Sequence, residues 1–256
     1  MSNSRFWFNG ICSDRFGLRI GGEDNFGAPE RVVTEYSVPG YNGSYVVDAG
    51  VYTNYIRQYQ AALLRSPALE QDMSAIKRWL QPDGEYHRLE DSYAPDVYRL
   101  ARLTGGIATQ AMGSSIRSVQ FPISFSCRPQ KFLKIGEQPL TISAETGIAE
   151  LVNPTGFNAW PLITFFGTEE SNEATVYIKD DWQGDVRGEI AFDVGNKLNV
   201  NVIFDTQTTE AYWADDGSSA NDAVYFQGDL FLPEGRSCIV LDSLGGCYVR
   251  PRWWRL

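Results

Sequence analysis

The sequence predicts a mainly-β protein built from two domains. Short runs rich in β-branched and aromatic residues are separated by Gly, Asn, Asp and Pro along most of the chain, which is the pattern of strands and turns. Only one stretch has a clear helical period. The charge is uneven, because residues 1–135 hold 15 basic and 13 acidic side chains (net +2), whereas residues 136–256 hold 7 and 19 (net −12). We therefore predict a domain boundary at about residue 135.

The first 135 residues predict several short strands and one helix. Strands are expected in "RFWFNGICSDRFGLRI", "RVVTEYSV" and "SYVVDAGVYTNYIRQYQAALL". A helix is expected in "ALEQDMSAIKRWL", with Ser66 as its cap and Pro67 at its first position. Its apolar side chains recur on one face, which we expect to pack in the core; they are Leu69, Met73, Ile76 and Leu80.

A hairpin and a long strand follow the helix. The hairpin is predicted in "EYHRLEDSYAPDVYRLARL". The segment "SVQFPISFSCRP" alternates cleanly between apolar and polar residues, so it predicts a half-buried strand. Pro122 on its polar side indicates a sheet edge or a bulge. The next segment, "RPQKFLKIGEQP", predicts a linker, and the short β-type runs beyond it predict an all-β sandwich or jelly roll.

Composition argues against several classes of protein. The four cysteines lack C-x-x-C spacing and His87 is the only histidine, so we expect no zinc site. No apolar run approaches the roughly 20 residues of a membrane span, and the first residues do not resemble a signal peptide. We therefore expect no membrane insertion, and folding in the cytoplasm of the producing cell. The acidic second half argues against direct nucleic-acid binding.

Two cysteines and two acidic segments remain as candidate sites. Cys238 and Cys247 flank a Gly-rich turn, which leaves a disulfide open, although a reducing compartment argues against one. The segment "DDGSSANDA" partly resembles a calcium loop, but its spacing differs from the EF-hand pattern and a mobile polar loop is the simpler interpretation. Its candidate oxygen ligands are Asp215, Asp216, Asn221 and Asp222.

The segment "KDDWQGD" suggests a glycosidase, because it places three carboxylates around an aromatic ring. These residues are Asp180, Asp181, Asp185 and Trp182. Neighbours on a strand point to opposite faces, so solvated turn acids are the simpler interpretation. We find no catalytic triad signature, P-loop or dinucleotide fingerprint. We expect no catalytic residue, no metal site and no cofactor, and the sequence does not look like an enzyme.

The stretch "SVPGYNGSYVVDAGVYTNY" carries two turn dipeptides between strand-like runs. Asn42-Gly43 suits a type I′ turn, which needs a positive φ at both central residues. Pro39-Gly40 directly before it predicts a sharp bend. Turn chemistry alone predicts an ordinary hairpin here.

Five motifs occur in order along the chain. They are "FNGICSDRFGLRI"; "VPGYNGSYVVDAGVY", a V-P-G-x-N-G pattern followed by Asp48 and Gly50; "YRLARLTGGI" with "VQFPISFSCRPQKF"; "NPTGFNAWPLITFFG", which contains Pro154; and "VRPRWWRL", which contains Pro251, Arg252, Trp253 and Trp254. Together they resemble the distal tail proteins of long-tailed, non-contractile bacteriophages. Two departures stand out: Tyr41 occupies a position that is often basic in the family, and no added carbohydrate-binding module is evident.

The resemblance implies a fold and a role. Residues 1–135 would form a tail-tube-like β-sandwich with one helix and a hairpin, and residues 136–256 a galectin-like sandwich. Six copies would form a ring-shaped baseplate hub at the distal tip of the tail in the virion. Its implied partners are further copies of itself, the tail tube protein and the tail-associated or fibre protein, with the tape-measure and receptor-binding proteins as additional candidates in host attachment. No reaction is implied.

Two alternatives compete with this role. A carbohydrate-binding module would recognise host cell-wall polysaccharide through stacked aromatic rings, for which Trp160, Trp182 and Trp213 are the candidates. A glycoside hydrolase would act on the same polysaccharide.

The last residues, "VRPRWWRL", predict an ordered strand that closes the second domain. Trp253 and Trp254 are neighbours, so on a strand they face opposite sides. Leaving both in water would expose a large apolar area. Three of the second half's basic residues also lie here, so we expect them to face acidic neighbours or the N-terminal domain; they are Arg250, Arg252 and Arg255.

Overall fold

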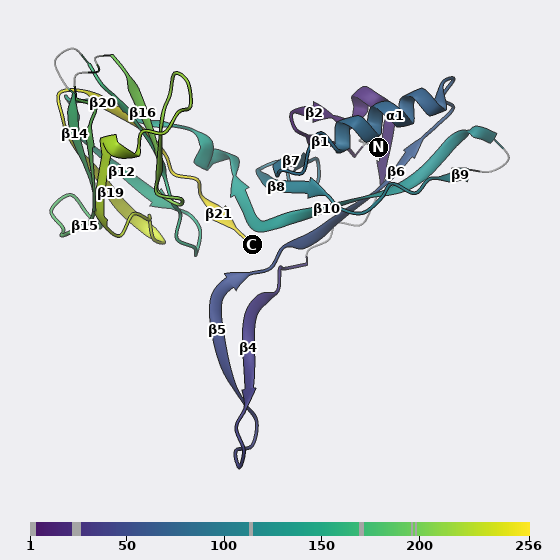
Figure 1. Cartoon of the computed structure of the whole chain (residues 1–256), viewed down its shortest axis with the longest axis horizontal. Coiled ribbons are helices and arrows are strands. Elements are labelled where there is room, and N and C mark those ends of the chain that lie inside the picture. The colour runs from purple at the N-terminus through teal and green to yellow at the C-terminus, as the bar shows by residue number, and fades with distance from the viewer. Residues whose placement is uncertain (1–3, 22–26, 113–114, 169–171, 196, 198) are drawn as a thin grey trace. The chain divides into compact units, whose positions relative to one another are not determined.

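The computed structural model describes residues 4–21, 27–112, 115–168, 172–195, 197 and 199–256 (Figure 1). The chain divides into two compact units, one that runs to Lys131 and includes Leu256, and one from Phe132 to Arg255. The segment expected to be a linker is instead regular structure. Strand β10 continues to Leu133, and a 3₁₀ helix follows at Lys134–Glu137. The apolar residues Phe132 and Leu133 extend the strand, and the Leu133 N–H donates to the Trp253 carbonyl at 2.8 Å.

The first unit is a curled antiparallel sheet in the order β2-β1-β7-β8-β10-β6-β3, with β9 also paired to β10. A bridge between Ser4 and Ile20 brings the chain before β1 to β3 at the far end of this order, so the sheet bends round on itself. Its strands are β1 (Phe6–Phe8), β2 (Ile11–Cys12), β3 (Leu18–Gly21), β6 (Tyr55–Leu63), β7 (His87–Asp91), β8 (Val97–Leu103), β9 (Gln110–Met112) and β10 (Ser115–Leu133).

The one α-helix among the described residues, α1 (Leu69–Leu80), forms where the apolar period predicts it. The prediction of Ser66 as the cap and Pro67 as the first helical residue is wrong, because Ala68 is the N-cap, no side chain caps the helix, and the first helical residue is Leu69. The Ser66 hydroxyl instead accepts from the Ala68 N–H and donates to Asp72. Of the predicted face, Met73, Ile76 and Leu80 are buried in the core of the first unit, with Ile76 fully inaccessible to water, and Leu69 is partly buried against it. Trp79 donates its indole N–H to the Phe8 carbonyl at 3.0 Å, which ties the helix to β1.

Strand β10 confirms the predicted alternation. Its inward side chains are all buried: Val119, Phe121, Ile123, Phe125 and Cys127. Pro122 pairs with Gln60 of β6 on one side. On the other side, the Ser124 carbonyl accepts from Thr104 just after β8, whereas Gln120 pairs with β9. The proline, which has no N–H, therefore lies where the partner strand changes.

The second unit is a sandwich of two five-stranded antiparallel sheets, in the orders β11-β20-β13-β16-β17 and β12-β19-β14-β15-β18. Phe165 of one sheet stacks on Phe192 of the other, with ring centroids 5.3 Å apart. The strands are β11 (Leu140–Ile142), β12 (Ile148–Asn153), β13 (Leu162–Phe166), β14 (Glu173–Lys179), β15 (Val186–Asp193), β16 (Asn201–Asp205), β17 (Glu210–Trp213), β18 (Val224–Gly228), β19 (Gly235–Asp242) and β20 (Gly246–Arg250). A short strand, β21 (Trp254–Arg255), follows β20.

The predicted mainly-β fold with one helix is confirmed. The alternation of apolar residues places one face of each sandwich strand in the core, as in β14, where Ala174, Val176 and Ile178 are buried. All four cysteines are free. Cys238 lies in β19 and Cys247 in β20, so the two belong to different sheets.

Candidate functional site

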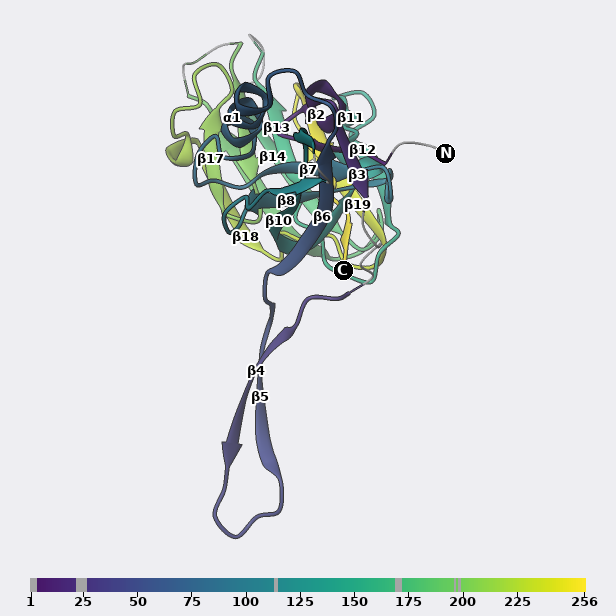
Figure 2. The same cartoon turned by 90° about the vertical axis from the view of Figure 1, so that its right-hand side faces the viewer.

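Exposed apolar side chains are concentrated on a hairpin formed by β4 (Arg31–Ser37) and β5 (Ser44–Tyr52), which we call the arm (Figures 1 and 2). These two strands form a sheet of their own, separate from the other three. Eight large apolar side chains of this hairpin and its loop are exposed, a concentration unusual for a surface that stays in water. They are Val33, Tyr36, Val38, Tyr41, Tyr45, Val46, Val47 and Val51.

The loop of the arm differs from the predicted type I′ turn. The Tyr41 N–H donates to the Val38 carbonyl at 3.1 Å, and Gly40 has a φ of 81°. With Pro39 before it, this is the pattern of a type II turn, so the predicted sharp bend is present. Asn42 does not have a positive φ, whereas Gly43 does, at 94°. The Asn-Gly pair therefore ends a six-residue loop and does not close a two-residue hairpin.

Asp48 and Gly50 form an irregularity in the arm. Arg31 pairs with Tyr52 but Val33 pairs with Asp48, so β5 carries extra residues at this point. Gly50, with a φ of 73°, donates its N–H to Asp48 Oδ1 at 2.8 Å. Arg31 contacts the other oxygen of Asp48 at 2.7 Å and holds the pKa of that exposed carboxyl below its usual value. The two residues of the motif thus shape a bulge.

The two faces of the arm have different chemistry. Directly paired residues of an antiparallel ladder share a face, and successive residues alternate between faces. The pairs Tyr36–Tyr45 and Thr34–Val47 therefore make one face, which is aromatic and apolar. The opposite face is mixed, because it contains Glu35 and Asp48 beside valines and serines. The aromatic face is the better candidate for a protein contact.

A second candidate region is the C-terminal motif "VRPRWWRL", which is held by an ion pair between Arg252 and Asp205 that we call the clasp. Arg252 donates two hydrogen bonds to the Asp205 carboxylate, at 2.6 and 2.7 Å, and a third to the Trp160 carbonyl at 2.6 Å. The planar guanidinium fits a carboxylate in this two-pronged way. The prediction that an arginine of this segment faces an acidic neighbour is confirmed for Arg252.

Both terminal tryptophans are buried, so the prediction of an ordered terminus is confirmed. Trp254 stacks on Phe157 at 4.4 Å and donates to the Asn158 carbonyl. Trp253 packs so closely on Gly136 that a Cβ there would lie 2.5 Å from the Trp253 nitrogen. The prediction that this strand closes the sandwich is wrong, because β21 pairs with β10 and not with either sandwich sheet.

The chain leaves the sandwich after β20 because of two adjacent residues, Pro251 and Arg252. Pro251 lacks the N–H that would continue the ladder after β20. Arg252 has a φ of 56°, a left-handed conformation that turns the chain out of the sheet. The Arg252 N–H then donates to the Gly136 carbonyl at 3.0 Å.

Replacing Arg252 with Ala is expected to lower the free energy of unfolding of the second unit by about 1.5–3 kcal/mol, the usual range for hydrogen bonds to a charged group. Urea unfolding measures this change. Arg250→Ala, at an exposed residue two positions earlier, is the control and should have little effect. Equal decreases in the free energy of unfolding in the two variants would show that the clasp does not hold the terminus.

Pro154 belongs to a tightly bonded loop at the start of the second unit. Pro154 itself is exposed, whereas the preceding Asn153 is buried. The Asn153 amide donates to the carbonyls of Phe157 and Leu232 and accepts from Thr155. The sequence motif pointed to Pro154, but Asn153 forms the hydrogen bonds that hold the loop.

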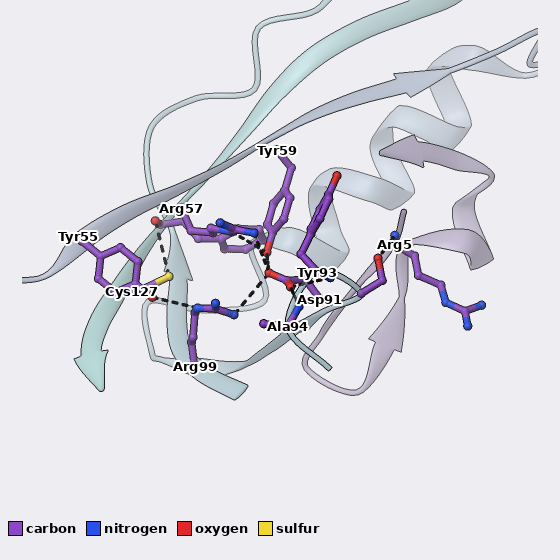
Figure 3. A network of polar contacts seen from close by, with 11 residues as sticks. Arg5, Tyr55, Arg57, Tyr59, Asp91, Tyr93, Ala94, Arg99 and Cys127 are labelled. Atoms are coloured by element: carbon purple, nitrogen blue, oxygen red, sulfur yellow. Dashed lines mark hydrogen bonds and ion pairs between the residues drawn. The ribbon is translucent and has the colours of Figure 1, made fainter. Parts of the chain in front are cut away.

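The first unit also contains a buried polar network that the sequence analysis did not identify (Figure 3). Asp91, 1% exposed, receives the Tyr59 hydroxyl at 2.7 Å, and its carboxylate faces Arg57 at 3.2 Å and Arg99 at 3.4 Å. Its other oxygen accepts the backbone N–H groups of Tyr93 and Ala94. One carboxylate thus links β6, β7, β8 and the turn that joins the last two.

The network is structural and not catalytic. Both guanidiniums and the carboxylate are almost inaccessible to water, so no substrate can reach them. The neighbouring Cys127 is fully buried, and burial raises the pKa of its thiol to about 12 despite the nearby arginines. A thiol in this state is a poor nucleophile near neutral pH. Burial also raises the pKa of Tyr55 to about 12.

These raised pKa values predict alkaline destabilisation. An unfolded thiol titrates near pH 9.0 and the folded Cys127 thiol near 12, so the folded state binds this proton more tightly. The contribution of this thiol to the free energy of unfolding is complete below pH 9 and is lost as the pH rises from 9 towards 12. We expect the melting temperature to fall over this range, and less steeply between pH 9 and 10 for Cys127→Ala. An unchanged slope for Cys127→Ala would contradict the assignment.

The three candidate sugar-stacking tryptophans lie on different elements. Trp160 precedes β13, and Trp182 is 59% exposed in the turn between β14 and β15. Trp213 ends β17, where the Lys197 ammonium lies 3.8 Å from the centre of its ring and covers one face. Trp160 is near Asp205 at one end of β16, whereas Trp213 pairs with Val202 at the other end. The structure does not gather them into one site.

The acidic candidates lie in turns or loops, as the simpler interpretation expects, except Asp222, which with Asn221 belongs to a 3₁₀ helix at Asn221–Ala223. Asp180 pairs with Arg187, and Asp181 accepts the Gln183 N–H within its own turn. Asp216 accepts the Ser218 N–H in the same manner. Across the described ranges, no group of three or more His, Cys, Asp or Glu is placed to hold a metal ion. In the same part of the chain, none of the helices has the length and apolar character of a membrane span.

Comparison with solved structures identifies the fold. The Dit protein (gp 19.1) of phage SPP1, described as a paradigm of the hub adsorption apparatus in phages that infect Gram-positive bacteria, superposes with a TM-score of 0.70. The match covers 97% of this chain and 98% of that one at 12% sequence identity. The chain has the fold of a phage tail hub protein.

Two structures of the phage p2 baseplate in its activated conformation share this tail hub fold. The calcium form matches with a TM-score of 0.56 and 10% identity, and the strontium form with 0.52 and 9%; each match covers 96% of this chain and 97% of the other. By sequence, no protein-family model and no curated protein matches the chain. The fold that the sequence motifs implied is therefore confirmed by structure at very low sequence identity.

Proposed function

We propose that the chain is a structural subunit of a phage tail tip, and that six copies form a ring-shaped hub. The observation that carries this proposal is the match to the SPP1 hub protein over nearly the whole of both chains, which includes both units. The hub would join the tail tube to the tail-associated or fibre protein and to the receptor-binding proteins. Residues 1–135 would form the ring, and residues 136–256 would carry partner surfaces.

The arm supports an assembly role. A two-stranded hairpin is marginally stable by itself in water, and this one exposes eight large apolar side chains. An arm that docks on the next copy makes a heterologous contact, and six such contacts close a ring without any cofactor. No reaction is proposed.

Gold-labelled antibody fragments against this chain test the proposed location on virions that contain it. We expect label at the distal end of the tail only. Antibody fragments against the tube protein serve as the control and should label the length of the tail. Label along the tube or on the capsid would contradict the hub role, and release of reducing sugars from host wall polysaccharide by the pure protein would contradict the absence of a reaction.

A further inference from the structure

The edge strand β18 of the second unit is open to pairing. It is the last strand of its sheet, and β15 is its partner. Its sequence, "VYFQG", contains no Lys, Pro or acidic residue, although edge strands of soluble proteins usually carry such residues to prevent unwanted pairing. Four of its five residues are exposed, and they include Tyr225 at 63% and Phe226 at 46%.

A small slot lies on the outer face of this edge. It measures about 180 Å³ and is lined by Glu189, Ala191, Tyr225, Phe226 and Gln227. Gln227 is paired with Glu189, and Tyr225 with Ala191, so these four side chains share one face of the sheet. The slot therefore has an aromatic wall and a carboxylate–amide wall, with a methyl group between them.

The Glu189 carboxylate of the slot is held by a hydrogen bond but forms no ion pair with another described residue. Gln227 donates to Glu189 Oε2 at 2.7 Å, which fixes the group and leaves Oε1 available. Within the described residues, Glu189 forms no ion pair, and the neighbouring Arg187 is engaged by Asp180 and Asp229. An aromatic face beside an unpaired carboxylate suits a lysine or arginine side chain, which gains both a cation–π contact and an ion pair.

The other face of the same edge is apolar. Phe226 pairs with Ile190, whose side chain is buried in the sandwich, so Phe226 points towards the interior. Its ring meets Phe204 at 5.5 Å, yet almost half of the side chain remains in water. A strand added beside β18 would cover this area with its own apolar residues, because side chains alternate between the two faces.

We propose that β18 receives an extended basic segment of another protein as an additional strand. Its basic residues would occupy the slot between Tyr225 and Glu189, and the alternating apolar residues would cover Phe226. Backbone pairing would supply affinity and the slot would supply specificity, as in other cases of strand addition. The charge of residues 136–256, −12, favours a cationic partner over a neutral or acidic one. The proposal holds whether or not the chain forms a ring.

Peptide titration of the full chain tests the proposal. The probe is a fluorescent heptapeptide of sequence Thr-Arg-Val-Arg-Val-Arg-Thr, followed by fluorescence anisotropy. We expect it to bind, and Glu189→Gln to weaken binding about tenfold, the scale of a lost charge-assisted contact. The matched control is Glu150→Gln, which removes the same charge from an exposed residue of β12, at the opposite edge of the same sheet. This control should bind like the wild type, and equal melting temperatures would show that both variants fold.

Two further probes separate strand addition from other modes of binding. A peptide whose central Arg is N-methylated keeps its guanidinium but loses a backbone N–H, so we expect it to bind at least about tenfold more weakly. Equal weakening by Glu189→Gln and Glu150→Gln would overturn the proposal in favour of general charge attraction. Binding of the neutral sugar cellohexaose that is abolished by Tyr225→Ala, with no peptide binding, would overturn it in favour of a carbohydrate site.

Discussion

Replacing Asp91 with Asn is expected to destabilise the first unit by about 3–5 kcal/mol, the range observed when one partner of a buried ion pair is removed. The amide can still accept the backbone N–H groups of Tyr93 and Ala94, so the turn keeps its bonds. The negative charge that both buried guanidiniums contact, those of Arg57 and Arg99, disappears. Because a domain is stable by only about 5–15 kcal/mol, this is a large fraction of the total. Urea unfolding measures the change.

Two controls make this prediction specific. Asp48→Asn removes an acid that also pairs with an arginine, but both side chains of that pair are more than two-fifths exposed, so we expect little change. Adding Arg99→Met to Asp91→Asn removes one of the two buried cations that contact the lost carboxylate, and we expect it to recover part of the lost stability. If Asp91→Asn unfolds like Asp48→Asn, the network does not support the fold as we describe.

Replacing both tyrosines of the aromatic arm face, Tyr36→Ser with Tyr45→Ser, is expected to dissociate the proposed ring into single chains. The two residues pair directly and are 54% and 65% exposed, so the chain itself should remain folded. Buried aromatic residues dominate the energy of many interfaces, and truncation of one such residue often weakens binding by about 2 kcal/mol or more. In the proposed ring, loss of two residues from each of six equivalent contacts should therefore abolish assembly. Light scattering during size-exclusion chromatography measures the mass.

The opposite face of the arm provides the matched control. Val33→Ser with Val46→Ser also removes two exposed apolar side chains, from a face that includes Glu35 and Asp48. We expect this variant to assemble like the wild type. Dissociation of both variants would mean that the arm acts as a whole, and assembly of both would place the interface elsewhere on the chain.

The sequence predicted those elements in which buried apolar residues recur with a regular period. Helix α1 and strand β10 each show a regular period of apolar residues, and both lie where that period placed them. The buried network also left a signal, because Arg57 occupies the same register as the buried Tyr59, Ala61 and Leu63 of β6. A charged residue in an inward position must find a partner, and Asp91 stands in the inward register of β7 in the same way.

Other features depend on contacts between distant segments, which a local pattern does not contain. The loop of the arm takes six residues because a type II turn at Pro39-Gly40 precedes Asn42-Gly43, and the dipeptide alone favoured a shorter turn. The expected linker became strand and 3₁₀ helix because Leu133 and Gly136 bond to the C-terminal segment. The three tryptophans considered for sugar stacking share a residue type but not a place in the fold.

Negative-stain electron microscopy of the purified wild-type chain, with the tail tube protein added if the chain does not assemble by itself, tests the ring most directly. Our account predicts closed particles whose class averages have sixfold symmetry. Single chains, twofold dimers or open filaments in both preparations would contradict a hexameric hub.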